Sequence, residues 1–188
     1  MNENTKIAMG IERLSTVFRA ALWEETKRCG LSPLQAQILL FIASHAPMQS
    51  RVSTLAKEFA VTKATVSDAV RALLEKGMLK KKSGDDARAF SLALTASGKK
   101  QVQKFSVLTE YFDEALTAIP ANERKKIWEG LLLLIGHLQK TGIIPLRMCF
   151  SCQHYGKHKS VPYCQLLEQA LQIEDIRLDC PEHSALAA

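Results

Sequence analysis

Four cysteines stand between residues 149 and 180 of this 188-residue chain, with the spacing C-x2-C-x11-C-x15-C: Cys149, Cys152, Cys164 and Cys180. A C-x2-C pair presents two thiolates to one metal ion from a single tight turn, and structural zinc commonly takes four such ligands. Because the segment is too short to bury a core of its own, a metal crosslink would supply folding energy. The spacing therefore predicts a metal site with these four ligands, and zinc is the expected cofactor.

Other chemistry fits the same cysteines. An all-thiolate ligand set, and the proline that follows Cys180, also suit an iron–sulfur cluster. Four unligated thiols acting as a redox switch are the third interpretation. His154 and His183 are close enough in sequence to replace a thiolate or to support one from outside the ligand set. Cys29 stands apart from the cluster, and we interpret it as a small residue that fills space at a helix end.

The ligands need an element that positions them, and around Cys164 the sequence predicts a helix. Its apolar side would carry Leu166, Leu167, Ala170 and Leu171. Cys180 is followed by Pro181, which ends regular structure and limits the freedom of the loop. We therefore expect a small helical tail that is crosslinked by its metal.

Charge and composition restrict the partners of the rest of the chain. The 47% apolar content is ordinary for a globular protein, and 25 Lys and Arg against 19 Asp and Glu give a net charge of +6. Seven basic residues and two acids fall between Lys80 and Lys104, so most of the excess charge is concentrated there. A basic patch of this kind is typical of a surface that binds a phosphate backbone, and a solvated basic face is the alternative.

The chain shows no export signal, because residues 1–14 are polar and mixed. Its longest apolar runs, residues 38–43 and 131–135, are too short to span a membrane. We therefore expect a cytoplasmic protein whose cysteines are thiols or metal ligands and not disulfides.

Residues 52–76 have the order of a helix-turn-helix. Residues 52–59 predict a short helix, Ala60 and Val61 a tight turn, and Thr62 the cap of a second helix that ends near residue 76. In the second helix, apolar residues at helical spacing predict the buried side: Val66, Val70, Leu73 and Leu74. The opposite side carries short, polar or charged residues: Lys63, Ala64, Ser67, Asp68 and Arg71. Such residues allow the start of a helix to enter a DNA major groove.

A β-hairpin is expected directly after these helices. Residues 78–82 and 90–94 predict two strands, and residues 83–88 predict the turn between them. A winged helix has this order of elements, with Arg88 at the wing free to enter the minor groove or bind phosphate. The fold class is therefore mainly α with a small β-hairpin wing (α+β).

Long amphipathic helices flank this unit. Residues 7–28 form one, a second begins at Ser32-Pro33, a third runs from residue 96 to about 117, and the last covers residues 123–140. The last helix is apolar on more than one side, so its own chain offers too little partner surface. Together with residues 7–28 it predicts a dimer interface, and complete burial within the chain is the alternative.

These motifs together resemble the MarR family of transcriptional regulators over roughly residues 7–140. The resemblance is carried by Thr65-Val66-Ser67, by LLEKGML at residues 73–79, by Asp86-x-Arg88 and by Leu94-Thr95-x-x-Gly98. It implies a homodimer with interleaved terminal helices that binds a pseudo-palindromic operator, usually as a repressor. It also implies that Arg88 enters the minor groove with Asp86 as its positioning partner. Many MarR-like proteins bind a small-molecule effector between the DNA-binding and dimerisation regions, so such an effector is a further candidate partner.

One residue departs from the family pattern. After Thr-Val-Ser, where many members have a basic residue, this chain has Asp68. A carboxylate there repels phosphate or accepts a hydrogen bond from a cytosine amino group. The departure concerns the base contacts and not the fold.

The chain is thus divided into a dimerisation helix (1–30), a DNA-binding domain (31–100), further dimerisation helices (101–145) and a Cys-rich tail (146–188). The expected function is a DNA-binding transcriptional regulator that responds to metal or redox state through its cysteines. The DNA-contacting residues are expected to be Thr62, Lys63, Thr65, Ser67, Arg71, Lys81, Asp86 and Arg88. No Ser-His-Asp set, phosphate loop or H-E-x-x-H motif stands out, so an enzyme is not expected. The alternative is a winged-helix protein whose tail serves redox catalysis or binds another protein.

Overall fold

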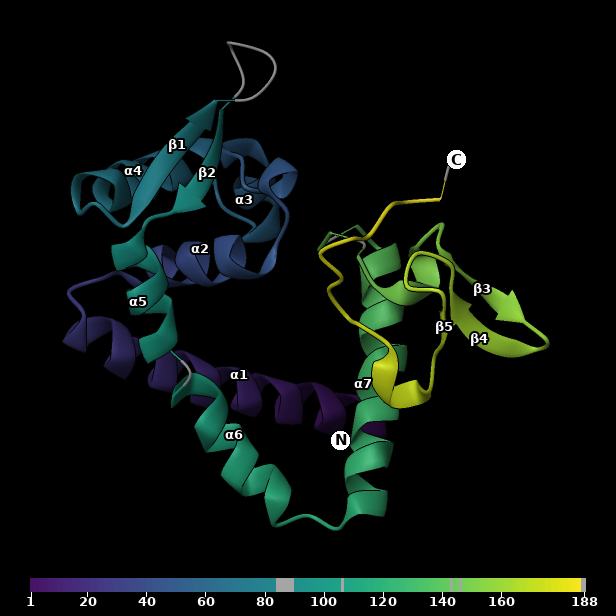
Figure 1. The fold of residues 1–188 in the computed structure, drawn as a ribbon. Coiled ribbons are helices and arrows are strands. Elements are labelled where there is room, and N and C mark those ends of the chain that lie inside the picture. The colour runs from purple at the N-terminus through teal and green to yellow at the C-terminus, as the bar shows by residue number, and fades with distance from the viewer. Residues whose placement is uncertain (84–89, 106, 143, 146, 187–188) are drawn as a thin grey trace.

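The computed structural model describes residues 1–83, 90–105, 107–142, 144–145 and 147–186. The described residues are mostly helical, and they also form two small antiparallel sheets (Figure 1). The α-helices are α1 (Glu3–Arg28), α2 (Pro33–Ser44), α3 (Val52–Glu58), α4 (Lys63–Glu75), α5 (Ala96–Lys104), α6 (Val107–Thr117) and α7 (Ala121–Lys140). The strands are β1 (Leu79–Ser83), β2 (Phe90–Leu94), β3 (Tyr155–His158), β4 (Val161–Cys164) and β5 (Gln169–Ala170), and the short 3-10 turns are η1 (Pro47–Gln49), η2 (Cys149–Ser151) and η3 (Ile173–Asp175).

Helices α2, α3 and α4 form the first compact unit. The helix α2 begins as its sequence predicts, because the Ser32 hydroxyl accepts from the Gln35 amide while the Gln35 side chain accepts from the Ser32 amide. The core holds apolar side chains from all three helices, among them Ile38, Leu39, Leu55, Val66 and Leu73. The helical spacing of apolar residues therefore identified the buried sides correctly.

The strands β1 and β2 pair as the predicted wing. Leu79 lies opposite Leu94 and Lys81 opposite Leu92 in the antiparallel register. Leu92 is buried, and its amide donates to the carbonyl of Ser50 at 2.8 Å, which fixes the hairpin to the loop before α3. These elements confirm the mainly helical fold with a β-hairpin wing.

The junction between the wing and α5 is closely packed. The Thr95 hydroxyl caps α5 by accepting from the Gly98 amide at 3.1 Å, and it donates to the carbonyl of Gly77 at 2.7 Å. A Cβ atom on Gly98 would lie 2.1 Å from the carbonyl oxygen of Met78. The Leu94-Thr95-x-x-Gly98 motif is therefore a packing requirement, since only glycine fits against this carbonyl.

The sequence predicts a single helix from residue 96 to about 117, and this prediction is wrong. The chain forms α5 and α6 instead, with Phe105 as the C-cap of α5. Phe105 is only 2% exposed and packs in the core of the first unit, and its amide bonds to the Val102 carbonyl at 3.0 Å in a tight last turn. Burial of this ring keeps α5 on the winged unit, while α6 continues in a new direction (Figure 1).

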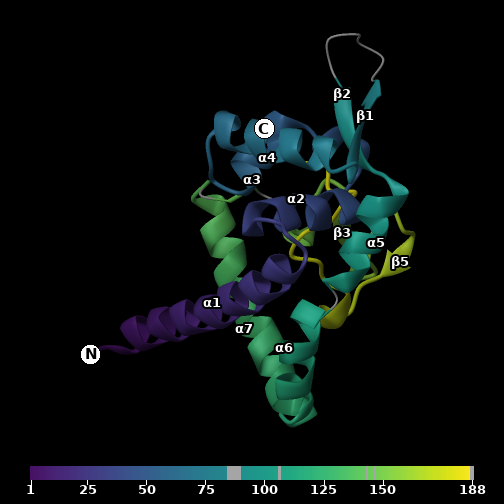
Figure 2. The same cartoon turned by 90° about the vertical axis from the view of Figure 1, so that its left-hand side faces the viewer.

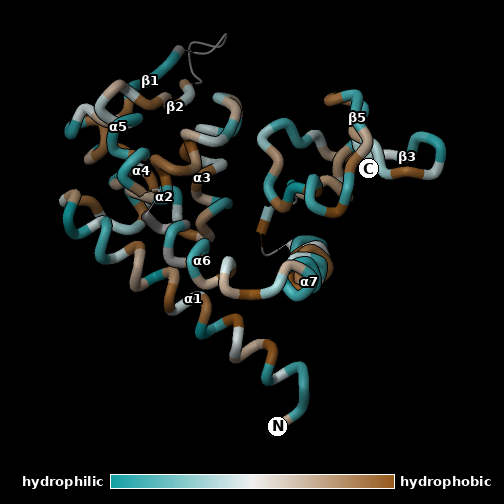
Figure 3. Tube along the Cα trace, turned by 60° about the horizontal axis from the view of Figure 1, so that its bottom comes forward, coloured by the Kyte–Doolittle hydropathy of each residue, from teal (hydrophilic) through white to brown (hydrophobic). Residues whose placement is uncertain are grey.

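Helix α1 contacts the rest of the chain mainly through its C-terminal half. Leu22 is buried, whereas Ile7 and Leu14 are 51% and 56% exposed. In Figure 2 the N-terminal half of α1 extends away from the body, and in Figure 3 hydrophobic and hydrophilic positions alternate along it. Little of the apolar stripe of α1 is therefore covered by other residues of its own chain.

The tail forms a second small unit on α7. Its core contains Leu132 from α7 together with Met148, Leu171 and Ile176 from the tail. The Trp128 indole donates to the carbonyl of Ile173 at 2.9 Å and supports the same contact. The tail thus completes its core with a face of α7.

The helix predicted around Cys164 is wrong, because the segment belongs to a three-stranded sheet of order β3-β4-β5. Cys164 ends β4 and pairs with Tyr155 on one side and Gln169 on the other. Of the four apolar residues that suggested a helix, Leu166 and Leu167 lie in a tight connection, Ala170 lies in β5 and Leu171 follows it. Glu168 in the connection has a φ of 52°. That backbone conformation excludes a continuous helix.

Within the residues that the structure describes, no helix is both long enough and apolar enough to cross a membrane.

Candidate DNA-binding surface and thiol site

The predicted recognition helix α4 presents its polar residues outward. Thr62, Lys63, Thr65 and Arg71 are exposed, and Ser67 is half-buried. The Thr62 hydroxyl caps the helix by accepting from the Thr65 amide at 3.1 Å, and the two hydroxyl oxygens lie 2.8 Å apart. The predicted contact residues of this helix therefore share one outer face, and its N-terminal turn carries short side chains.

The acid that departs from the family pattern has a partner on the same face. The Asp68 carboxylate lies 3.1 Å from the Arg71 guanidinium, one helical turn away, and both side chains are largely exposed. An exposed pair of this kind adds little to stability. Its effect is on charge, because Asp68 neutralises the one arginine of the exposed face of α4.

The wing adds positive charge beside this face. Lys80, Lys81 and Lys82 are exposed on β1, and the Lys81 ammonium lies 4.6 Å from the centre of the Phe90 ring. That cation–π contact holds Lys81 over β2. Asp86 and Arg88, the residues predicted for the wing tip, lie outside the described residues.

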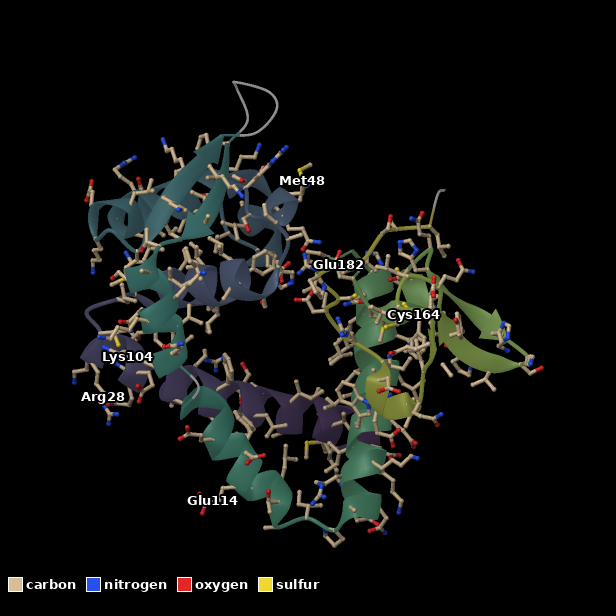
Figure 4. The ribbon with its side chains drawn as sticks, viewed as in Figure 1. Arg28, Met48, Lys104, Glu114, Cys164 and Glu182 are labelled. Atoms are coloured by element: carbon tan, nitrogen blue, oxygen red, sulfur yellow. The ribbon has the colours of Figure 1, made fainter. Side chains whose placement is uncertain are left out.

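The four tail cysteines line one small cavity of about 30 Å³. His154, Tyr155 and three leucines share its walls, so the surroundings are mostly apolar. All five cysteines of the chain are free thiols. Cys164 is labelled among the tail side chains in Figure 4. The structure therefore brings the predicted ligands together from three segments of the chain: the turn η2, the strand β4 and the residues around Cys180.

Backbone hydrogen bonds hold the cysteines in place. Cys149 and Cys152 flank the turn η2, which is closed by the Cys152 amide bonding to the Cys149 carbonyl at 3.0 Å. The Cys149 amide donates to the Arg177 carbonyl at 3.1 Å, and the Arg177 amide donates to the Cys149 sulfur at 3.2 Å. The Cys180 amide donates to the carbonyl of Arg147 at 2.9 Å. An amide that points at sulfur favours a thiolate there.

The protonation of Cys149 reflects this environment. Burial raises the pKa of the Cys149 thiol, and the other three cysteines raise it further, while the Arg177 amide opposes the shift. The four groups are therefore close enough to interact electrostatically. Nevertheless, no three His, Cys, Asp or Glu side chains among the described residues are arranged to hold a metal ion.

The nearby histidines separate into two environments. His154 lines the cavity with the cysteines. His183 instead lies with its Nε2 atom 3.0 Å from the Ser151 hydroxyl, and burial lowers the pKa of its imidazole. Cys29 packs against the core of the winged unit, far in sequence from the thiols of the tail.

A charge cluster that the sequence did not predict joins the tail to the winged unit. The Arg147 guanidinium donates to Asp179 of the tail and to Glu58 of α3. The second oxygen of Asp179 lies 2.9 Å from Nε2 of His45, the residue that ends α2. Burial acts to raise the pKa of Asp179, but the hydrogen bonds from His45 and Arg147 outweigh it and lower the pKa to about 2.

Apolar and neutral contacts accompany the cluster. The His45 ring stacks on Phe41 with 3.8 Å between ring centres, and the Arg147 guanidinium lies 5.1 Å from the centre of the Phe41 ring. The Gln49 amide donates to the carbonyl of Pro181 at 3.2 Å. In Figure 4, Met48 and Glu182 mark the two sides of this junction. We call the contacts of Arg147, Asp179, Glu58, His45 and Gln49 the tail junction.

Comparison with known proteins agrees with this architecture. Residues 30–89 match the model of the MarR family. No curated protein matches the chain. Among solved structures, the S. aureus MepR–DNA complex is 19% identical with a TM-score of 0.57, and it covers 73% of this chain and 98% of its own.

Two further solved structures are similar. The transcriptional regulator PA3341 is 22% identical with a TM-score of 0.61, and it covers 71% of this chain and 98% of its own. A MarR family regulator from Silicibacter pomeroyi is 20% identical with a TM-score of 0.57, and it covers 68% of this chain and 86% of its own. Each of these three structures leaves more than a quarter of this chain uncovered. Residues 30–89 are thus similar to the MarR family, and the chain has the winged-helix fold of solved transcriptional regulators, one of them a MarR family member.

Proposed function

We propose that this protein is a homodimeric, sequence-specific DNA-binding transcriptional regulator, acting as a repressor, with a metal-binding thiol site in its tail. The observation that carries the proposal is the outer face of α4, where the polar residues Thr62, Lys63, Thr65 and Ser67 lie together. The basic strand β1 follows this helix directly. The N-terminal turn of α4 carries short side chains and the positive end of the helix dipole. Both features suit entry into a major groove lined by phosphate.

The solved S. aureus MepR–DNA complex supports this proposal at the level of the fold. On this chain, α4 would read bases, and the lysines of β1 would bind the backbone beside the groove. Arg88 remains the residue predicted to enter the minor groove, with Asp86 as its positioning partner. Lys81 is held over Phe90, so Lys80 and Lys82 are the lysines of β1 left to reach phosphate.

Replacement of Lys82 by alanine tests the DNA-binding surface. We expect weaker binding of all duplexes, and a plot of log affinity against log salt whose slope falls by about one unit, because one phosphate contact is lost. The measurement is fluorescence anisotropy on an operator selected from a random duplex library with the wild-type protein. Lys125→Ala on α7 is the matched control, since Lys125 pairs with Glu174 in the tail. An unchanged salt slope in Lys82→Ala would contradict the placement of β1 against the phosphates.

The tail thiols suit a zinc ion in donor type and number. Four cysteines line one cavity, and the Arg177 amide already points at one sulfur. Binding would require the thiol side chains to rotate toward a common centre and to lose their protons. The bound ion would supply a crosslink between η2, β4 and the segment around Cys180, with no open position for catalysis.

Metal analysis of protein purified under reducing conditions tests the site. We expect about one zinc ion per chain in the wild type and a loss of most of it in Cys164→Ser or Cys180→Ser. Cys29→Ser is the control, because Cys29 packs in the other unit. If the purified protein is brown and contains iron and sulfide, the site holds an iron–sulfur cluster instead of zinc. If the wild type is metal-free and still folded, the metal site is excluded.

A further inference from the structure

The tail junction links three elements that are far apart in the sequence. Arg147 and Glu58 are separated by 89 positions, and His45 and Asp179 by 134. Glu58 is the last residue of α3, the first helix of the helix-turn-helix, and α3 packs on the recognition helix α4. The tail thus contacts the winged unit directly, at the end of α2 and at the last residue of α3.

The junction depends on an arginine that is almost fully buried. The side chain of Arg147 is 10% exposed, and that of Glu58 is 19% exposed. A charge this deeply buried is tolerated only when its hydrogen-bonding groups are paired. Arg147 therefore requires both carboxylates, one from the tail and one from α3.

The thiol site and the junction use the same stretches of backbone. Arg147 is two residues before Cys149, and Asp179 directly precedes Cys180. The Arg147 carbonyl accepts from the Cys180 amide, so the backbone beside the thiols also joins the two charged residues. Any constraint that fixes Cys149 and Cys180 also fixes Arg147 and Asp179.

We propose that metal binding at the thiol site stabilises α3 through the junction of Arg147 and Asp179 with Glu58 and His45. The inference rests on the thiol site of the proposed function, and it adds the route by which that site reaches the DNA-binding unit. With zinc bound, Arg147 and Asp179 are held opposite α3 and the end of α2. Without zinc, the tail backbone relaxes, the junction opens, and α3 loses a charge-assisted contact at its C-terminal end.

Hydrogen–deuterium exchange of the full-length protein tests this route without DNA. Removal of zinc with a chelator, under reducing conditions, is expected to speed exchange of the amides of residues 55–59 by on the order of tenfold. In Glu58→Gln, the same amides exchange faster even with zinc bound, and zinc removal changes them by less than about twofold, because the negative charge that pairs with Arg147 is already lost. Glu75→Gln, an exposed glutamate on α4, is the matched control and keeps the wild-type response.

A second variant guards against a general loss of folding in Glu58→Gln. His45→Gln removes the other contact of Asp179 from the winged side, and it should also reduce the zinc response. If the wild type retains one zinc per chain but residues 55–59 exchange equally with and without it, the route is wrong and the thiol site stands. If Glu58→Gln and His45→Gln both keep the full zinc response, the junction is not the route. If no zinc is retained, the site and the route both fail, while the Lys82→Ala measurement still judges DNA binding.

Discussion

Replacement of Gly98 by alanine is expected to lower the free energy of unfolding by about 3 kcal/mol or more. The added Cβ atom would lie 2.1 Å from the Met78 carbonyl oxygen and 3.2 Å from Cδ2 of Leu94. The leucine can move, but the carbonyl cannot, because it also accepts from the Thr95 amide at 3.1 Å. The substitution must therefore separate α5 from the base of the wing.

Urea unfolding followed by circular dichroism measures this effect. Gly130→Ala in α7 is the control, since a Cβ atom there meets nothing within 4 Å. It should leave stability unchanged or raise it by about 1 kcal/mol, as expected for alanine within a helix. Equal unfolding midpoints for Gly98→Ala and wild type would mean that the backbone at Met78 gives way more easily than its hydrogen bonds indicate.

The double substitution Ile11→Glu and Leu14→Glu is expected to weaken dimerisation by at least about 100-fold. Both residues lie on the exposed apolar stripe of α1, which we propose is covered by a second copy of the chain. Two carboxylates placed in such an interface would be buried without partners, at a cost of several kcal/mol. The variant should therefore be monomeric at micromolar concentrations at which the wild type is a dimer.

Sedimentation velocity distinguishes the two states. Arg13→Glu is the matched control, because residue 13 lies on α1 away from the apolar stripe and its charge changes in the same direction. It should sediment as the wild type does. If the double variant remains dimeric, the second copy of the chain binds elsewhere, and α1 is not the principal interface.

Local signals in the sequence were sufficient for most of the helices. The Ser32 capping box and the spacing of Val66, Val70 and Leu73 are encoded by neighbouring residues, so α2 and α4 began and packed as predicted. The apolar stripe around Phe105 is equally periodic, but it does not reveal that this ring packs into a different unit from α6. The break between the two helices is a tertiary effect.

The tail was harder to predict for a similar reason. The residues between Cys164 and Leu171 have helical spacing, yet pairing of Cys164 with Tyr155 and Gln169 places them at a sheet. The tail junction depends on contacts across about 90 to 130 positions, and no local pattern encodes these. The cysteine spacing did identify which residues line one cavity, although it does not specify the rotamers that metal binding needs.

The course of the chain has a mechanical consequence. It leaves the winged unit along α5 and α6, turns back along α7, and returns through the tail to touch α2 and α3. The chain therefore closes a loop in space, and the winged unit is held to the rest of the chain at two places, through α5 and through the tail junction. If two copies of the chain bind DNA as proposed, a winged unit held at two places has fewer orientations to lose on binding. The dimer would then accept a narrower range of distances between the two half-sites of an operator. The tail would then limit which half-site spacings the protein binds, independently of the contacts that α4 makes with bases.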